Sequence, residues 1–272
     1  MCTTCGCAAS DQSVRFDGEP ASAAHAHAHG GPHDSHAHGL HHHTHGEGRR
    51  TVDLGADLLA KNDRFAAENR AWFRRHQIAA FNLIGAPGAG KTSLLEHTIR
   101  RLSPTVRIAV LEGDQETDHD AQRIRAAGCT VVQINTGAGC HLDAHMVEHG
   151  VERLKLPPRS LLLIENVGNL VCPALFDLGE AAKIAVMSVT EGEDKPEKYP
   201  HVFRAADVLV VTKTDLLPHL RFDLDRCLSI ARRVNPRLRV FEVSTTSGQG
   251  FSAWCDWLHS QCVTVADSVV KS

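Results

Sequence analysis

The stretch of the sequence best suited to chemistry is GAPGAGKT, residues 85–92, which fits the pattern G-x-x-x-x-G-K-[ST]. An apolar stretch typical of a strand precedes it and one typical of a helix follows, a context that favours a phosphate-binding loop over a chance glycine-rich turn. Its backbone N–H groups would surround nucleotide phosphates, Lys91 would contact the β- and γ-phosphates, and the Thr92 hydroxyl would bind Mg²⁺. The predicted phosphate-binding residues are Gly85, Ala86, Pro87, Gly88, Ala89, Gly90, Lys91, Thr92 and Ser93.

The stretch VVTKTDLLP, residues 210–218, predicts which base the nucleotide has. It resembles the N-K-x-D loop of GTPases, whose aspartate pairs with guanine. Lys213 and Asp215 match this pattern, and Thr212 stands where asparagine is usual, with a hydroxyl that can replace part of the asparagine hydrogen bonding. The later stretch VSTTSGQG would place Ser244 and Thr245 behind the base. These loops favour GTP over ATP.

Two carboxylates, Asp114 and Glu165, end apolar stretches that we predict to be strands. Side chains at the C-terminal ends of parallel strands face the crevice in which ligands bind. We therefore expect both carboxylates to hold Mg²⁺, directly or through water, and to form the catalytic set together with Lys91 by positioning the attacking water. The alternative is that one of these carboxylates only caps a loop and does not belong to the site.

The first residues contain C-x-x-C-G-C, formed by Cys2, Cys5 and Cys7. Three thiolates and the terminal amine suit Zn²⁺ as a tetrahedron or Ni²⁺ as a square plane. A redox C-x-x-C is the alternative, but it is expected beside a βαβ unit, which this end of the chain lacks.

A second group of metal-ligating residue types lies inside the chain. Cys140 and His141 are neighbours in a glycine-rich stretch, and Cys172 follows Glu165. A metal held there would lie close to the phosphate site. Each cysteine taken alone is more often a small buried residue, so packing is the alternative.

These residues need a parallel sheet to position them. Apolar stretches alternate with helical ones, which predicts an α/β fold: a mostly parallel β-sheet with helices on both faces, as in P-loop G-domains. A helical segment with apolar residues at Leu54, Leu58, Phe65 and Trp72 precedes the sheet and is either continuous or broken in its middle. The predicted strands lie at residues 78–85, 107–114, 130–135, 160–166, 182–190, 207–213 and 238–243.

Residues 8–50 have few large apolar side chains, and ten of the 19 histidines lie between His25 and His45. Such a composition cannot offset its ordering entropy, so we predict a disordered segment that binds metal through imidazoles; an inert linker or a purification tag is the alternative. The expected organisation is a metal-binding N-terminal tail, residues 1–50, and a P-loop domain with an N-terminal helical segment, residues 51–272.

Composition excludes several classes of protein. The net charge of −3 gives no reason to expect nucleic acid or a membrane as partner, and no apolar run is long enough to cross a bilayer. The first residues do not resemble a secretory signal, and the nine cysteines are an odd number. We expect a cytoplasmic protein with reduced thiols.

Together these motifs resemble the HypB family of nickel-incorporation GTPases. The resemblance runs from about Leu54 to Phe251 and adds the N-terminal CTTCGC. Its motifs occur in the family order: LLAKNDRFAAENR, the P-loop, EGDQETDHDAQRI, TGAGCHLDA, IENVGNLVCPA and EGEDKPEKYP.

The resemblance implies a GTPase that binds nickel and helps to load it into [NiFe]-hydrogenase. It implies that CTTCGC is a high-affinity nickel site and that the G-domain forms a homodimer whose interface metal ligands map to Cys140, His141 and Cys172. It further implies two partners, the hydrogenase large subunit and a second nickel/zinc accessory protein. The presence of both the cysteine motif and the histidine-rich segment suggests storage as well as delivery of nickel.

Three alternatives remain open. The chain could be a nickel or zinc reservoir with a vestigial G-domain, although Lys91, Thr92, Asp114 and Asp215 are intact. It could be a P-loop kinase or ATPase with an incidental metal-binding tail. It could also serve urease or another metalloenzyme, although the urease accessory GTPases have Cys-Pro-His where Ala174 follows Cys172-Pro173 here.

Overall fold

The computed structural model describes residues 15–16, 47–115 and 118–268, and its framework is one eight-stranded sheet in the order β1-β4-β3-β5-β2-β6-β7-β8. All neighbouring strands pair in parallel except β1, which is antiparallel to β4. The strands are β1 Arg15–Phe16, β2 Ala79–Ile84, β3 Arg107–Asp114, β4 Thr130–Asn135, β5 Ser160–Glu165, β6 Ala182–Ser188, β7 Val208–Thr212 and β8 Arg239–Glu242. Each of the seven strands predicted from the sequence is confirmed to within two residues.

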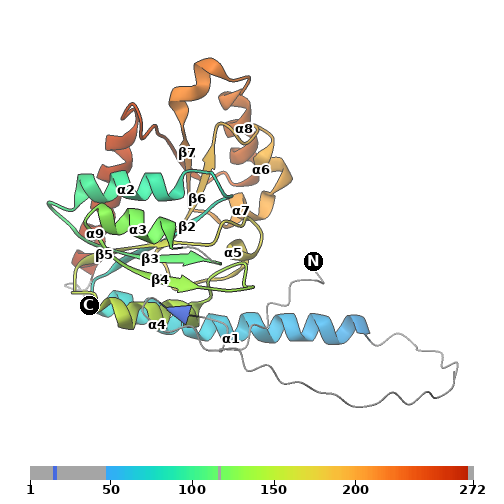
Figure 1. Ribbon diagram of the computed structural model, residues 1–272. Coiled ribbons are helices and arrows are strands. Elements are labelled where there is room, and N and C mark those ends of the chain that lie inside the picture. The colour runs from blue at the N-terminus through green and yellow to red at the C-terminus, as the bar shows by residue number, and fades with distance from the viewer. Residues whose placement is uncertain (1–14, 17–46, 116–117, 269–272) are drawn as a thin grey trace, which may run out of the picture.

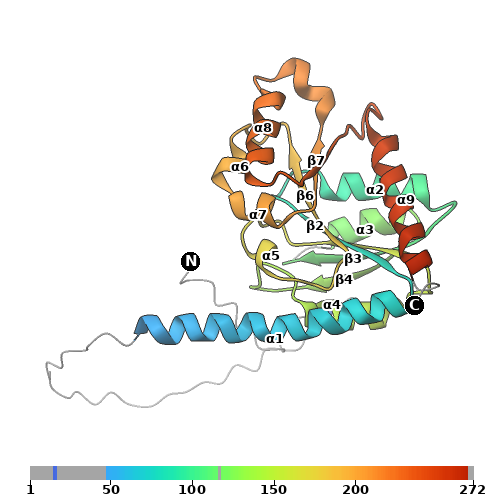
Figure 2. The same cartoon turned by 180° about the vertical axis from the view of Figure 1, so that it is seen from behind.

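Helices cover both faces of this sheet, as Figures 1 and 2 show from opposite sides. The helices are α1 Glu47–Arg75, α2 Lys91–Leu102, α3 His119–Ala126, α4 Ala144–Leu154, α5 Cys172–Leu175, α6 Lys195–Lys198, α7 Pro200–Ala205, the 3₁₀ helix η2 Thr214–His219, α8 Leu224–Val234 and α9 Phe251–Ser268. Helices α2, α3 and α9 pack on one face. On the other face α1 and α4 lie side by side over β3 and β5, and α7 and α8 cover β6 and β7.

The strand sequences explain this layered arrangement. Every residue of β2, β5 and β7 is buried, because both faces of a parallel sheet are covered by helices. Alternate residues face opposite layers: Leu161 and Leu163 pack under α2, while Leu162 and Ile164 pack under α1 and α4. The P-loop domain therefore has the predicted α/β architecture.

Helix α1 is continuous, although polar residues interrupt its apolar stripe. Asn62 and Asn69 are buried, and both are bonded to neighbouring segments. The Nδ2 of Asn62 donates to the Asp177 carbonyl at 2.8 Å, and the Nδ2 of Asn69 donates to the Ala144 carbonyl at 2.7 Å. Arg70 adds an ion pair with Asp177 at 2.6 Å. The Asn69 bond holds α1 against α4, and the two bonds to Asp177 hold it against the segment between α5 and β6, so no break is needed.

One part of the tail departs from the expected disorder. Arg15 and Phe16 form β1, where they pair with Asn135 and Ile134 of β4. The Phe16 ring is half-buried and lies 4.2 Å from the Arg153 guanidinium carbon, which explains why this apolar residue is ordered.

Helix α1 begins at Glu47, four residues before the boundary expected from composition. The remaining tail residues, with Cys2, Cys5, Cys7 and the ten histidines, lie outside the described residues. Among the helices that the structure describes, none is both long and apolar enough to span a membrane.

Candidate nucleotide and metal sites

The P-loop follows β2 at the centre of the sheet and leads directly into α2. Gly88 and Gly90 have φ angles of 77° and 91°, which L-residues with a side chain rarely adopt. At Gly85 a Cβ atom would clash with the carbonyl oxygen of Val186 on β6. The glycine positions of the motif are therefore required by the backbone path of the loop.

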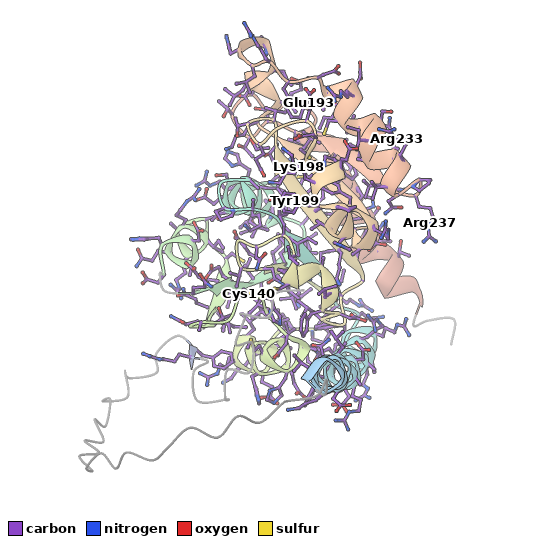
Figure 3. All side chains as sticks on the ribbon, turned by 90° about the vertical axis from the view of Figure 1, so that its right-hand side faces the viewer. Cys140, Glu193, Lys198, Tyr199, Arg233 and Arg237 are labelled. Carbon is purple, nitrogen blue, oxygen red and sulfur yellow. The ribbon has the colours of Figure 1, made fainter. Side chains whose placement is uncertain are left out.

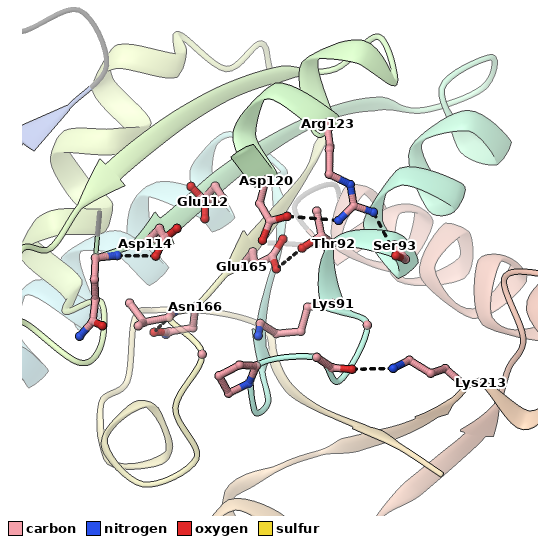
Figure 4. Close-up of a pocket in the computed structure, with 17 residues that line it drawn as sticks. Lys91, Thr92, Ser93, Glu112, Asp114, Asp120, Arg123, Glu165, Asn166 and Lys213 are labelled. Atoms are coloured by element: carbon pink, nitrogen blue, oxygen red, sulfur yellow. Dashed lines mark hydrogen bonds and ion pairs between the residues drawn. The ribbon is translucent and has the colours of Figure 1, made fainter. Parts of the chain in front are cut away.

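The P-loop borders a cavity of about 470 Å³, here called the P-loop pocket, which is shown in Figure 4. The pocket contains several of the predicted residues: Pro87, Gly88, Gly90, Lys91, Thr92, Ser93, Asp114, Glu165 and Lys213. It also contains residues that the sequence reasoning missed: Glu112, Gly113, Gln115, Asp120, Arg123, Asn166, Val167 and Gly168.

The Lys91 ammonium is buried inside the loop. Its Nζ donates to the carbonyl oxygens of Gly85 at 3.1 Å and Ala86 at 3.4 Å. Burial lowers the pKa of Lys91, while the nearby Glu165 carboxylate opposes that shift.

Thr92 and Glu165 are brought together at the base of the pocket. The Thr92 hydroxyl donates to Glu165 Oε1 at 2.8 Å, and Glu165 Oε2 is buried with no hydrogen-bond partner among the described residues. Burial raises the pKa of Glu165 to about 7, against the opposing effects of Lys91 and the Thr92 hydrogen bond. Asp114 lies nearby, and its Oδ1 accepts from the Gln115 backbone N–H at 2.6 Å. Hard oxygen donors of this kind, two of them carboxylates, fit Mg²⁺.

Three of the missed pocket residues could have been found from the pattern EGDQETDHDAQR. Glu112 is two residues before Asp114 on the same strand, so the two share one face of the sheet end. Asp120 and Arg123 are three residues apart at the start of α3, and Arg123 Nη1 donates to Asp120 Oδ1 at 3.2 Å. Nη2 of Arg123 also donates to Ser93 Oγ at 3.1 Å, which joins α3 to the first turn of α2, directly after the P-loop (Figure 4).

The T-K-x-D loop is hydrogen-bonded to the P-loop. Thr212 is buried, and its Oγ1 donates to the Ala89 carbonyl at 2.6 Å. Lys213 Nζ donates to the Gly88 carbonyl at 2.8 Å.

Farther along this loop, Asp215 Oδ1 accepts from the Ser244 hydroxyl at 2.5 Å. Thr245 follows in the same β8–α9 loop and is half-exposed. The predicted base-binding residues thus come together beside the P-loop, and their role in binding guanine stays a prediction.

The structure also brings together Cys140, His141 and Cys172, here called the Cys140 cluster. One ligand atom from each lies within 4.8 Å of the others, and the Cys140 and Cys172 thiol sulfurs are 2.9 Å apart. His141 is buried against Phe176, with ring centroids 3.9 Å apart, and burial lowers the pKa of its imidazole. Two thiols and a neutral imidazole fit Ni²⁺ or Zn²⁺.

Exposure distinguishes this cluster from the packing cysteines. Cys140 and Cys172 are half-exposed, and Figure 3 shows Cys140 at the surface. Cys129, Cys227 and Cys255 are buried, and burial raises the pKa of these thiols to about 12, 11 and 11. The packing alternative therefore suits those three cysteines better than the cluster.

Hydrogen bonds join the P-loop pocket to the Cys140 cluster. Gln115 Nε2 donates to the Gly139 carbonyl at 3.2 Å, next to Cys140. Asn166 Oδ1 accepts from the Leu142 backbone N–H at 3.1 Å, next to His141. Gln115 and Asn166 both line the pocket, so the loop that contains two of the three cluster residues is bonded to its wall.

Comparison with known proteins shows which proteins this chain is similar to. The family described as "CobW/HypB/UreG, nucleotide-binding domain" matches residues 79–242. The chain is 51% identical over 283 residues to hydrogenase maturation factor HypB of Azotobacter vinelandii, covering 96% of this chain and 92% of that relative. It is 53% identical over 213 residues to HypB of Escherichia coli K12, covering 78% of this chain and 73% of that relative.

Two solved structures have the same fold. HypB from Archaeoglobus fulgidus superposes with a TM-score of 0.70 at 42% identity, covering 75% of this chain and 100% of that one. HypB from Helicobacter pylori, in complex with nickel, superposes with a TM-score of 0.71 at 34% identity, covering 75% and 96%.

Proposed function

Because this chain belongs to the HypB family of hydrogenase maturation factors, we propose that it is a GTPase that couples GTP binding and hydrolysis to nickel delivery into [NiFe]-hydrogenase. The observation that best supports this proposal is the pair of hydrogen bonds from Gln115 and Asn166 of the P-loop pocket to the loop of the Cys140 cluster. A change at the phosphates is thereby transmitted to residues that flank Cys140 and His141.

The nucleotide part of the proposal rests on the pocket geometry. The P-loop N–H groups and Lys91 bind the phosphates, and Asp215 binds guanine. Thr92, Asp114 and Glu165 would hold Mg²⁺, which would neutralise charge on the phosphate oxygens when bound. Lys91, Asp114 and Glu165 form the proposed catalytic set.

The cargo part rests on the donor sets. The Cys140 cluster binds Ni²⁺ or Zn²⁺, and the Helicobacter pylori relative is described as being in complex with nickel. In the tail, Cys2, Cys5 and Cys7 form a tight nickel site, and the histidine-rich segment stores further ions at lower affinity.

The proposed setting follows from the same family membership. The chain acts in the cytoplasm as a homodimer through its G-domain, and it works with the hydrogenase large subunit and a second nickel/zinc accessory protein. We propose no nucleic-acid or membrane partner. Urease is the alternative client, because the Helicobacter pylori relative is described as a hydrogenase/urease maturation factor.

The GTPase step is tested by measuring the binding and the hydrolysis of GTP and of ATP, in the parent chain and in the variant Lys91→Ala. Loss of a preorganised cation at the transferred phosphate is expected to lower kcat by about 10²-fold or more. Lys198→Ala, at an exposed lysine paired with Asp194, is the matched control and should leave turnover unchanged. Parent-like turnover in Lys91→Ala, or equal use of ATP, would contradict the proposal.

The coupling step is tested in a chain with Cys2, Cys5 and Cys7 replaced by serine, by titrating Ni²⁺ and following the thiolate-to-nickel absorption band. Histidines do not give this band, so it reports the Cys140 cluster. We expect the nickel affinity to differ about 5- to 150-fold between GDP and a non-hydrolysable GTP analogue. Cys172→Ala should abolish the band and Cys262→Ala should not; equal affinities in both nucleotide states would exclude coupling.

A further inference from the structure

Two buried asparagines of α1 contact both chain segments that hold the Cys140 cluster. Cys140 and His141 lie in the β4–α4 loop, and Cys172 begins α5, 32 residues after Cys140. We propose that Asn62 and Asn69 are positioning residues of this cluster, which fix the separation of the two segments and thereby the affinity for metal. The proposal rests on the nickel site proposed above, and it adds a helix that supplies none of the three ligands.

Each asparagine bridges the two segments. Asn62 Oδ1 accepts from the Ala144 backbone N–H at 2.9 Å, and Asn62 Nδ2 donates to the Asp177 carbonyl at 2.8 Å. Asn69 Nδ2 donates to the Ala144 carbonyl at 2.7 Å and to the Leu178 carbonyl at 3.1 Å. The two asparagines are two helical turns apart, so they lie on the same face of α1.

These contacts lie close to the metal ligands along the chain. Ala144 begins α4 three residues after His141. Asp177 directly follows Phe176, whose ring centroid is 3.9 Å from that of the His141 imidazole. Phe176 in turn comes four residues after Cys172. A shift of either segment relative to α1 would therefore change how the three ligands lie relative to one another.

The segment between α5 and β6 lies directly against the backbone of α1. A Cβ atom at Gly179 would be 2.7 Å from the Ala66 carbonyl oxygen and 2.8 Å from the Arg70 backbone nitrogen. The Arg70 side chain also forms an ion pair with Asp177 at 2.6 Å. Contacts this close leave the segment little freedom to slide along the helix.

The chemistry of the amide explains why asparagine occupies these two positions. Burying an amide is unfavourable unless its hydrogen bonds are made, and both of these buried amides bond to two backbone groups. Such bonds hold two segments at a defined separation, which an apolar side chain of the same size does not do. Because metal–ligand distances vary by only about 0.2 Å, that separation affects the affinity of a site built from both segments.

The experiment measures the nickel affinity of Asn69→Ala through the thiolate-to-nickel absorption band, in the chain whose three N-terminal cysteines are replaced by serine. Loss of the two bonds should weaken nickel binding about tenfold, as for other residues that orient metal ligands. Asn235→Ala is the matched control, because Asn235 Nδ2 also donates to two backbone carbonyls, those of Phe203 at 3.0 Å and Ala206 at 2.8 Å. Both variants should lower the midpoint of urea unfolding, but Asn235→Ala should keep the parent nickel affinity.

A second variant tests the same role if Asn69→Ala does not fold. Arg70→Met removes only the half-exposed ion pair with Asp177, so the chain should fold and its nickel affinity should fall about two- to fivefold.

The outcomes separate this inference from the proposed nickel site. Parent affinity in folded Asn69→Ala, parent affinity in Arg70→Met if Asn69→Ala does not fold, or an equal loss of affinity in Asn235→Ala would overturn the positioning role alone. A parent chain that shows no thiolate-to-nickel band would overturn the nickel site itself, and the positioning role with it.

Discussion

At the scale of single residues, Thr212 shows how a departure from a sequence pattern is accommodated. Its hydroxyl donates to the Ala89 carbonyl at 2.6 Å and lies 3.3 Å from the Met187 carbonyl. Through this bond the hydroxyl joins the T-K-x-D loop to the P-loop. The structural contribution of Thr212 is therefore this hydrogen bond between the two loops.

Replacing Thr212 with valine keeps the shape and removes this hydrogen bond. The Ala89 carbonyl would lose its buried donor, so we expect a loss of about 1–3 kcal/mol in the free energy of unfolding and weaker GTP binding. Urea unfolding and nucleotide titration measure the two effects. Thr245→Val, at a half-exposed position of the β8–α9 loop, is the control and should change stability by less than about 0.5 kcal/mol. A Thr212→Val protein as stable as the parent would contradict this account.

At the scale of elements, the loops after β3, β4 and β5 meet at one edge of the sheet. The Thr136 backbone N–H donates to the Asp114 carbonyl at 2.8 Å, and its hydroxyl donates to the Gly139 carbonyl at 2.8 Å. Gln115 reaches the same Gly139 carbonyl. These bonds make the β4–α4 loop, with Cys140 and His141, an extension of the pocket wall.

Gln115→Ala tests this connection without disturbing the core, because Gln115 is exposed. Stability should change by less than about 0.5 kcal/mol, whereas the ratio of nickel affinities with GDP and with a GTP analogue should move toward one. Gln122→Ala, which removes an exposed amide on α3, is the matched control and should keep the parent ratio. If both variants keep the parent ratio, coupling does not pass through Gln115.

The sequence predicted the elements better than the contacts between their ends. Continuous apolar runs identify the strands because a parallel sheet is buried on both faces, and the P-loop pattern reports a backbone path that needs Gly85 and Gly90. The pairing of β1 was missed, since a two-residue edge strand has no periodicity. The roles of Gln115 and Asn166 were missed because each residue is bonded to a residue 24 positions away in the sequence. The two loops meet only in the folded structure.

At the scale of the whole molecule, metal-ligating residues occur both in the tail and in the P-loop domain. The ten tail histidines are interleaved with alanine, glycine and aspartate between β1 and α1. Both ends of that segment are attached to the domain. At one end β1 pairs with β4, and at the other end α1 is hydrogen-bonded to α4. If the segment binds ions as we propose, they would be kept at high effective concentration near the domain sites.

Replacing the ten histidines between His25 and His45 with glutamine keeps the segment length and removes its imidazoles. We expect most bound nickel equivalents to be lost and the tightest one to remain, because Cys2, Cys5 and Cys7 are unchanged. Equilibrium dialysis with metal analysis measures both classes of bound nickel, the tightest equivalent and the weaker sites.

In the parent chain the weaker class of nickel sites should also diminish below about pH 6.5, since an imidazole must be neutral to bind metal and its ordinary pKa is near that value. The glutamine variant should show no such loss of weak sites. If the tightest equivalent disappears with the histidines, the cysteine motif does not bind nickel by itself, and the division of the tail into a tight site and a reserve is wrong.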